Sequence, residues 1–63
     1  MHLTLKQTRL VKEKTQSEMA EMLGIHVDTY RKLEEKPENT TIKQAKMISS
    51  FLGVSYNDIF FAD

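Results

Sequence analysis

The sequence predicts an all-α protein of five short helices packed around one core. Apolar residues recur at helical spacing in most segments, and no run alternates apolar and polar residues as a half-buried β-strand does. The two glycines and the single proline all fall between the apolar-periodic segments, where helices are expected to end. A chain of 63 residues is expected to form one domain, spanning residues 1–63.

The first helix is expected within residues 3–13, which contain neither glycine nor proline. A second helix is expected at about 16–23, because Thr15 with Glu18 makes a capping box, in which each side chain binds the other's free backbone N–H. Gly24 is expected to end this helix in the left-handed conformation. Its apolar residues follow helical spacing: Met19, Ala20, Met22 and Leu23.

A third helix is expected at about 27–35. His26 occupies its cap position, where an imidazole is a poor substitute for a hydroxyl or a carboxylate. Asp28 favours the first turn by opposing the helix dipole. The candidates for its inward side are Tyr30, Leu33 and Val27.

The segment after the third helix is expected to be a loop, because Pro37 disfavours helix at the residue before it. Thr41 with Gln44 makes a second capping box, which opens a fourth helix that Gly53 ends. The apolar positions of this fourth helix are Ile42, Ala45, Ile48, Phe51 and Leu52. A last short helix is expected after Ser55, with Asp58 in its first turn and Ile59 and Phe60 as its apolar residues.

Composition argues against several kinds of site. There is no cysteine, so disulfides and thiolate metal sites are excluded. His2 and His26 have no clustered partner ligands and are expected to be surface or capping residues. We find no nucleophile–base pair, glycine-rich phosphate loop or metal-ligand spacing, so we expect neither an enzyme nor a cofactor. No membrane span and no signal peptide is expected, which points to the cytoplasm.

The formal net charge of zero disfavours nucleic-acid binding at first sight, because phosphate contacts usually need a basic surface. The charge is uneven, however. Lys6, Arg9, Lys12 and Lys14 lie in the first fourteen residues against Glu13 alone. The local arrangement therefore has to decide whether a nucleic acid can bind.

The second and third expected helices are joined by Gly24-Ile25-His26, a turn of the length found in helix-turn-helix units. In such a unit the second helix enters the major groove of DNA with its N-terminal residues against the base edges.

The chain resembles the Cro/C1-type helix-turn-helix family, often called the Xre family, of phage repressors and bacterial regulators. The motifs that carry the resemblance are TQSEMAEMLGI at 15–25, YRKLE at 30–34 and FLGVSYNDIF at 51–60. The resemblance implies a lambda-repressor-like DNA-binding domain that acts as a sequence-specific, repressor-like transcriptional regulator. It also implies that Gln16 bonds a DNA phosphate, and that Arg9 and Glu34 form a structural pair between the first and third helices.

The base-reading residues are expected on the outward side of the third helix. Arg31 or Lys32 can bond O6 and N7 of guanine, Asp28 can accept from N4 of cytosine, and Val27 can touch a thymine methyl. The alternative is that these residues form only a solvated charged face. Candidates for phosphate contacts are Thr15, Gln16, Thr29, Lys36, Asn39, Thr40 and Lys43.

The sequence departs from the family pattern at several positions. The loop after the third helix holds Glu35 and Glu38 and no glycine, and its carboxylates would repel a DNA backbone. Lys14 replaces an apolar residue, and Thr8 replaces a leucine, for which Leu10 or Val11 is expected to compensate. These departures suggest weak, salt-sensitive or dimer-dependent binding.

The chain is similar to the short, Cro-like form of the family, with no room for a ligand-sensing domain or a small-molecule ligand. A dimer on a palindromic double-stranded DNA site is expected, with half-sites ~34 Å apart. The candidates for the dimer contact are Ile59, Phe60 and Phe61, and the alternative is that they close the core. A second function class stays open: a protein-interaction module on the same fold, antirepressor-like or antitoxin-like, which zero net charge and the acidic loop favour.

Overall fold

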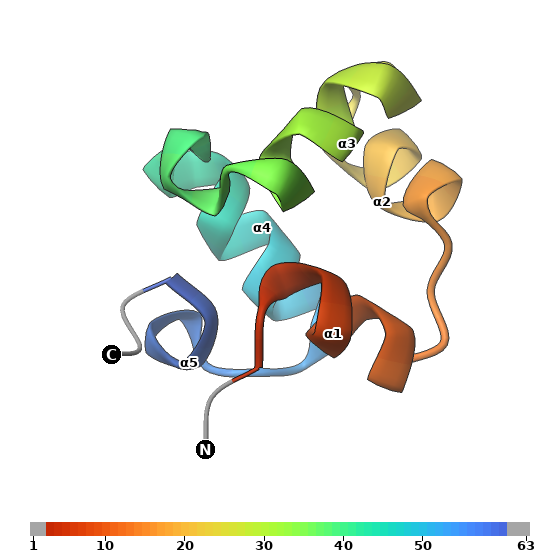
Figure 1. Ribbon diagram of the computed structural model, residues 1–63. Helices are drawn as coiled ribbons and strands as arrows, with labels where there is room; N and C mark the ends of the chain where they lie inside the picture. Colours follow the sequence, from red (N-terminus) through yellow and green to blue (C-terminus); the bar gives the residue numbers. More distant parts are fainter. Residues whose placement is uncertain (1–2, 61–63) are drawn as a thin grey trace.

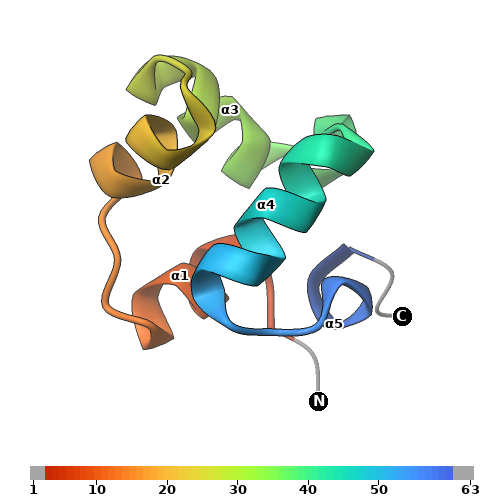
Figure 2. The same cartoon turned by 180° about the vertical axis from the view of Figure 1, so that it is seen from behind.

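The computed structural model describes residues 3–60, apart from the side chain of Phe60. This part of the chain is all-α, with five α-helices, one 3-10 turn and no strand. The elements are α1 (Leu5–Val11), α2 (Gln16–Leu23), α3 (Val27–Glu35), η1 (Pro37–Asn39), α4 (Ile42–Leu52) and α5 (Tyr56–Phe60). Figures 1 and 2 show α2 and α3 together at one end of the molecule, α1 and α5 at the other, and α4 running between them.

The helix starts are set by short-range capping. The expected boxes at Thr15 and Thr41 are both present. A third box, which the sequence analysis missed, lies at Thr4: its hydroxyl accepts from the N–H of Gln7 at 3.1 Å, and Gln7 Oε1 accepts from the Thr4 N–H at 2.9 Å. This box starts α1 at Leu5, so the helix is shorter than the expected 3–13 range.

His26 caps α3 better than the sequence suggested. Its Nδ1 accepts from the backbone N–H of Asp28 at 3.1 Å, so the imidazole does the work of a capping hydroxyl. At the other end of the motif turn, Gly24 has φ 70 and ends α2 in the left-handed conformation. Together these two residues set the direction in which α3 leaves α2.

The core is built from one to three residues of each of α1 to α4. Leu5, Met19, Tyr30 and Ile48 are its largest fully buried side chains. Four more buried apolar residues surround them, Ala20, Leu33, Ala45 and Leu52. The inward side predicted for α3 from Tyr30 and Leu33 is therefore confirmed.

Two of the five apolar positions expected on α4 do not lie in the core. Ile42, the first residue of the helix, is 66% exposed. Phe51 is 38% exposed and lies under the ammonium of Lys14, whose Nζ is 5.1 Å from the ring centroid. Lys14, which stands where the family has an apolar residue, therefore covers an aromatic ring by a cation–π contact.

The expected compensation for Thr8 does not occur. Leu10 and Val11 are 55% and 65% exposed, because they lie on the outer side of α1. Thr8 itself is buried, and its hydroxyl donates to the carbonyl of Thr4 at 2.9 Å. The hydroxyl is thus satisfied within its own helix, and the threonine occupies the core position without leaving a polar group unpaired.

Candidate nucleic-acid interface

The outward side of α3 is a polar surface on a helix whose other side is buried. Asp28, Thr29, Arg31 and Lys32 are exposed, whereas Tyr30 and Leu33 are buried. Val27 is half-buried and packs against the edge of the core, so only part of its side chain faces outward. The helix is therefore rigidly seated by one side and presents the other to a partner.

Glu34 anchors the C-terminal end of α3 to α1 and α2. Its carboxylate accepts from Arg9 Nε at 2.5 Å, from the Tyr30 hydroxyl at 2.7 Å and from Gln16 Nε2 at 3.0 Å. The Arg9 and Glu34 side chains are only 7% and 4% exposed. Such a buried carboxylate is tolerable because its oxygens are hydrogen-bonded and its charge is paired.

The titration of this cluster follows from its contacts. Burial alone would raise the pKa of Glu34, but hydrogen bonds from Arg9, Tyr30 and Gln16 outweigh it and hold the pKa below its ordinary value. The bond to Glu34 raises the pKa of Arg9. Burial, and then the bond to Glu34, raises the pKa of Tyr30 well above its ordinary value. The glutamate and arginine are therefore charged and the tyrosine is neutral at ordinary pH.

Gln16 and Arg31 connect this cluster to the outward face. Gln16 Nε2 donates to Glu34, and Gln16 Oε1 accepts from Arg31 Nε at 3.2 Å. Arg31 Nη1 also donates to the Asp28 carboxylate, one turn earlier on α3. Gln16 is expected to contact a phosphate, but both its amide nitrogen and its amide oxygen already make hydrogen bonds within the protein.

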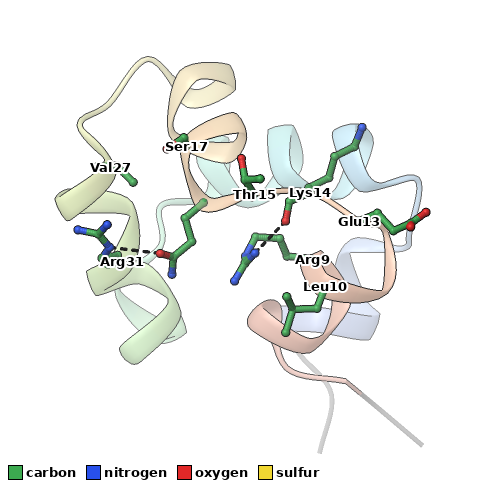
Figure 3. Close-up of a pocket in the computed structure, with 9 residues that line it drawn as sticks. Arg9, Leu10, Glu13, Lys14, Thr15, Ser17, Val27 and Arg31 are labelled. Carbon is green, nitrogen blue, oxygen red and sulfur yellow. Dashed lines mark hydrogen bonds between the residues drawn. The ribbon is translucent and has the colours of Figure 1, made fainter.

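An open groove of about 480 Å³ is lined by residues of α1, the linker after it, the start of α2 and α3. Figure 3 shows Arg31 and Val27 on one side of it, Arg9 and Leu10 on the other, and Thr15 and Ser17 between them. Arg9 also donates to the carbonyl of Lys14 at 2.8 Å, which fixes the linker before α2. The first N–H groups of α2 lack intrahelical partners, so they are donors that an anion can use. The groove is of mixed charge, because Glu13 lines it as well as Lys14, and its two arginines already pair with Glu34 and Asp28.

A second group of expected phosphate contacts lies around η1 and the start of α4. Lys36, Asn39 and Lys43 are exposed, and Thr40 is half-buried with a buried hydroxyl oxygen that has no hydrogen-bond partner in residues 3–60. Glu38 is exposed in the same turn. Cations and a carboxylate therefore share this edge, as the loop sequence suggested.

The remaining expected residues are placed as follows. Thr15 is exposed, but its hydroxyl already accepts from the N–H of Glu18 at 3.0 Å. Ile59 is half-buried and packs against the core. The Phe60 side chain and Phe61 lie outside the described residues, so their part in a dimer contact stays a prediction.

Sequence reasoning missed the contacts that join the groove to α3. The Asp28–Arg31 pair has a local signal, since residues three apart on a helix are neighbours. The Gln16–Arg31 and Gln16–Glu34 contacts have none, because they span 15 and 18 positions. The bond from the Tyr30 hydroxyl to Glu34 does have a local signal, because the two residues are four apart on the same helix.

Two further features of residues 3–60 bear on other kinds of site. This part of the chain holds no group of three or more His, Asp or Glu side chains placed to bind a metal ion. None of its helices is long and apolar enough to cross a membrane.

The sequence model of a protein family described as "Helix-turn-helix" matches residues 5–59. The match extends from the start of α1 into α5 and so includes both motif helices and the core. No curated protein and no solved structure matches the chain.

Proposed function

Since this chain belongs to the helix-turn-helix family of the Cro/C1 type, a family of DNA-binding regulators, we propose that it represses transcription by placing α3 in the major groove of a specific site on double-stranded DNA. The observation that carries this proposal is the division of α3 into a buried side and a polar side. Tyr30 and Leu33 seat the helix, Glu34 ties down its end, and the exposed side chains project away from the core. A major groove ~12 Å wide accepts one such helix.

Lys32 is the simplest candidate for a base contact. It is exposed on α3, and within residues 3–60 no hydrogen bond or ion pair holds its side chain. Its ammonium can therefore reach O6 and N7 of guanine without breaking an internal contact. Arg31 already donates to Asp28, so the two side chains would contact the bases as a pair. Val27 would contact a base with the exposed part of its side chain.

The phosphate contacts would fall on both sides of α3. The groove at the start of α2 would take one phosphate through the backbone N–H groups of Gln16 and Ser17, since the N–H of Thr15 already donates to Glu18 Oε1 at 2.8 Å. On the other side, the candidates are Thr29, Lys36, Asn39, Thr40 and Lys43. Two flanking contacts of this kind would set the depth and register of α3 in the groove.

We further propose that two copies bind a palindromic site, within the cytoplasm. The described residues measure 29 × 23 × 18 Å, so one copy is shorter than the ~34 Å between successive half-sites. Each copy has one α3 for one half-site. Ile59, Phe60 and Phe61 remain the candidates for the contact between copies.

The competing function is a protein-interaction module on the same fold, antirepressor-like or antitoxin-like. Zero net charge and the exposed Glu38 beside the expected phosphate contacts favour it. Salt distinguishes the two functions, because phosphate contacts release counterions and lose affinity steeply as salt rises, whereas a protein interface need not.

The test is a fluorescence anisotropy titration with DNA from upstream of the protein's own gene, at low and at physiological salt. We expect a saturable, salt-sensitive complex that Lys32→Ala weakens at unchanged thermal stability. Lys46→Ala is the matched control, since Lys46 lies beside Met22 and Phe51 in a different groove. If no complex forms at low salt even at high protein concentration, DNA is not the direct partner and the protein-interaction function is preferred.

A further inference from the structure

Arg31 is exposed on α3 and yet is held from two sides. Its Nε donates to Gln16 Oε1 at 3.2 Å, and its Nη1 donates to the Asp28 carboxylate. Gln16 belongs to α2 and Asp28 to α3 itself. The side chain is still 54% exposed, so these contacts fix the guanidinium without covering it.

The orientation of the Gln16 amide is dictated by a buried carboxylate. Glu34 is charged and can only accept, so the Gln16 NH₂ group must face it, and Nε2 lies 3.0 Å from Glu34 Oε1. The amide oxygen is thereby turned towards Arg31. Glu34 is in turn held by Arg9 and Tyr30 and is 4% exposed. The buried Glu34 thus fixes the Gln16 amide, and the Gln16 amide oxygen in turn fixes the exposed guanidinium of Arg31.

We propose that Gln16 and Asp28 are positioning residues that hold Arg31 for reading a guanine. The inference rests on the proposed function and deepens it by naming what sets base preference. The guanidinium carries more N–H donors than its two internal contacts use, and the remaining donors can meet O6 and N7 of guanine. A long cationic side chain that is already ordered loses less freedom on binding than a mobile one, and only one orientation of the base pair fits it.

Gln16 then has a different role from the phosphate contact expected of it: it sets the position of Arg31. A residue that only bonds phosphate affects all DNA sequences alike, because phosphates carry no base information. A residue that positions Arg31 affects discrimination at the base pair that Arg31 reads. The two roles are therefore separable by measuring base preference rather than affinity alone.

The first part of the test needs no DNA. In the free protein, the ¹⁵N–¹H signal of Arg31 Nε should exchange slowly with solvent in the wild type. It should exchange fast in Gln16→Met, which keeps the chain length and removes the amide. Glu38→Gln, a change in the η1 turn, should leave the signal unaltered. A fast-exchanging Arg31 Nε in the wild type would overturn the inference whatever DNA binding shows.

The second part measures base preference. Sequences bound by the wild type are selected from a random DNA pool, and each base pair of the selected site is then changed in turn. Arg31→Ala should reduce discrimination for guanine at one position by about tenfold. Gln16→Met and Asp28→Asn should reduce discrimination several-fold at that same position and leave the other positions unchanged.

Glu38→Gln is the matched control for Asp28→Asn, because each removes one exposed negative charge. The control should strengthen binding to all sequences alike and leave the preferences as they are. If Asp28→Asn instead sharpens the guanine preference, Asp28 restrains Arg31 from DNA and the inference is wrong. If the pool yields no bound sequence while Arg31 Nε is protected, the proposed function has failed, and the reading role fails with it although the internal contacts stand.

Discussion

At the scale of single residues, Glu34 both stabilises the fold and holds the side chains that position α3. One carboxylate receives Arg9 from α1, Gln16 from α2 and Tyr30 from its own helix. Three helices therefore meet at one charge. In a domain of this size, total stability is expected to be only about 3–9 kcal/mol, so a single such residue matters greatly.

Replacing Glu34 by Gln should lower the free energy of unfolding by about 3–5 kcal/mol, because Arg9 would be left buried without its counter-charge. Urea unfolding followed by circular dichroism measures this. Glu35→Gln, at the exposed neighbouring position, should change stability by less than about 0.5 kcal/mol. Equal losses in the two variants would show that the Arg9–Glu34 pair adds nothing beyond a surface charge.

The same carboxylate predicts a dependence on pH. Its pKa in the folded state lies below the ordinary value of 4.5, so its contribution is complete above that value and is lost as pH falls through the folded pKa. Wild type should therefore be more stable than Glu34→Gln near neutral pH, and the gap should narrow below about pH 4.5. Glu18, whose pKa is lowered by its bonds to Thr15, is present in both proteins and cancels in this comparison.

The cap at His26 gives a second prediction at this scale. His26→Ala should destabilise the protein by about 1 kcal/mol, since the N–H of Asp28 loses its acceptor. His26→Ser should be as stable as wild type or slightly more so, because a hydroxyl is the preferred acceptor there. Chemical unfolding of the two variants side by side decides this, and an unaffected His26→Ala would mean that the imidazole bond is lost in solution.

At the scale of elements, the turn between α2 and α3 decides how the motif helices cross. Gly24 has φ 70, and a Cβ built there would meet no atom within 4 Å. The cost of a side chain at this position is therefore one of backbone conformation and not of space.

Gly24→Ala should accordingly cost about 1–2 kcal/mol, the price of the left-handed conformation for a residue with a Cβ. Gly24→Asn should cost less, because asparagine tolerates that conformation. Thermal unfolding would show the order wild type, Gly24→Asn, Gly24→Ala. A larger loss for asparagine than for alanine would mean that space, and not backbone conformation, limits the position.

At the scale of the whole molecule, the distribution of charge matters more than its zero total. Lys32 lies on α3, Lys36 in the loop after it and Lys43 on α4, while Glu38 lies between Lys36 and Lys43 in the sequence. DNA affinity is then expected to be modest and to depend on a few cations.

Lys43→Ala should reduce the slope of log affinity against log salt by about 1, since one phosphate contact is lost. Lys46→Ala, with the same loss of charge on the same helix, should leave the slope unchanged, because Lys46 lies in the groove with Met22 and Phe51. Anisotropy titrations at several salt concentrations measure both slopes. Equal reductions of the salt slope in the two variants would mean that the slope reports the net charge of the protein and not a phosphate contact of Lys43.

The sequence by itself determined that there are five helices, the ends of α2 and α4, and the inward side of α3. The ends of α1 differ from the expected 3–13 range. Capping boxes at Thr15 and Thr41 and the left-handed glycines are interactions between residues at most five positions apart, so they can be read along the chain. The seating of α3 by Tyr30 and Leu33 follows from helical spacing alone. The resemblance to known regulators added the Arg9–Glu34 pair, which the structure contains.

Only the tertiary structure decided which of the polar side chains are free to meet a partner. The exposure of Leu10, Val11 and Ile42 depends on which helix covers each face, and spacing along the chain does not contain that information. The link from Glu34 through Gln16 to Arg31 joins residues 15 and 18 positions apart, which meet because α2 and α3 cross at the turn. Local physics therefore builds the helices, and their packing decides that Arg31 is held while Lys32 is not.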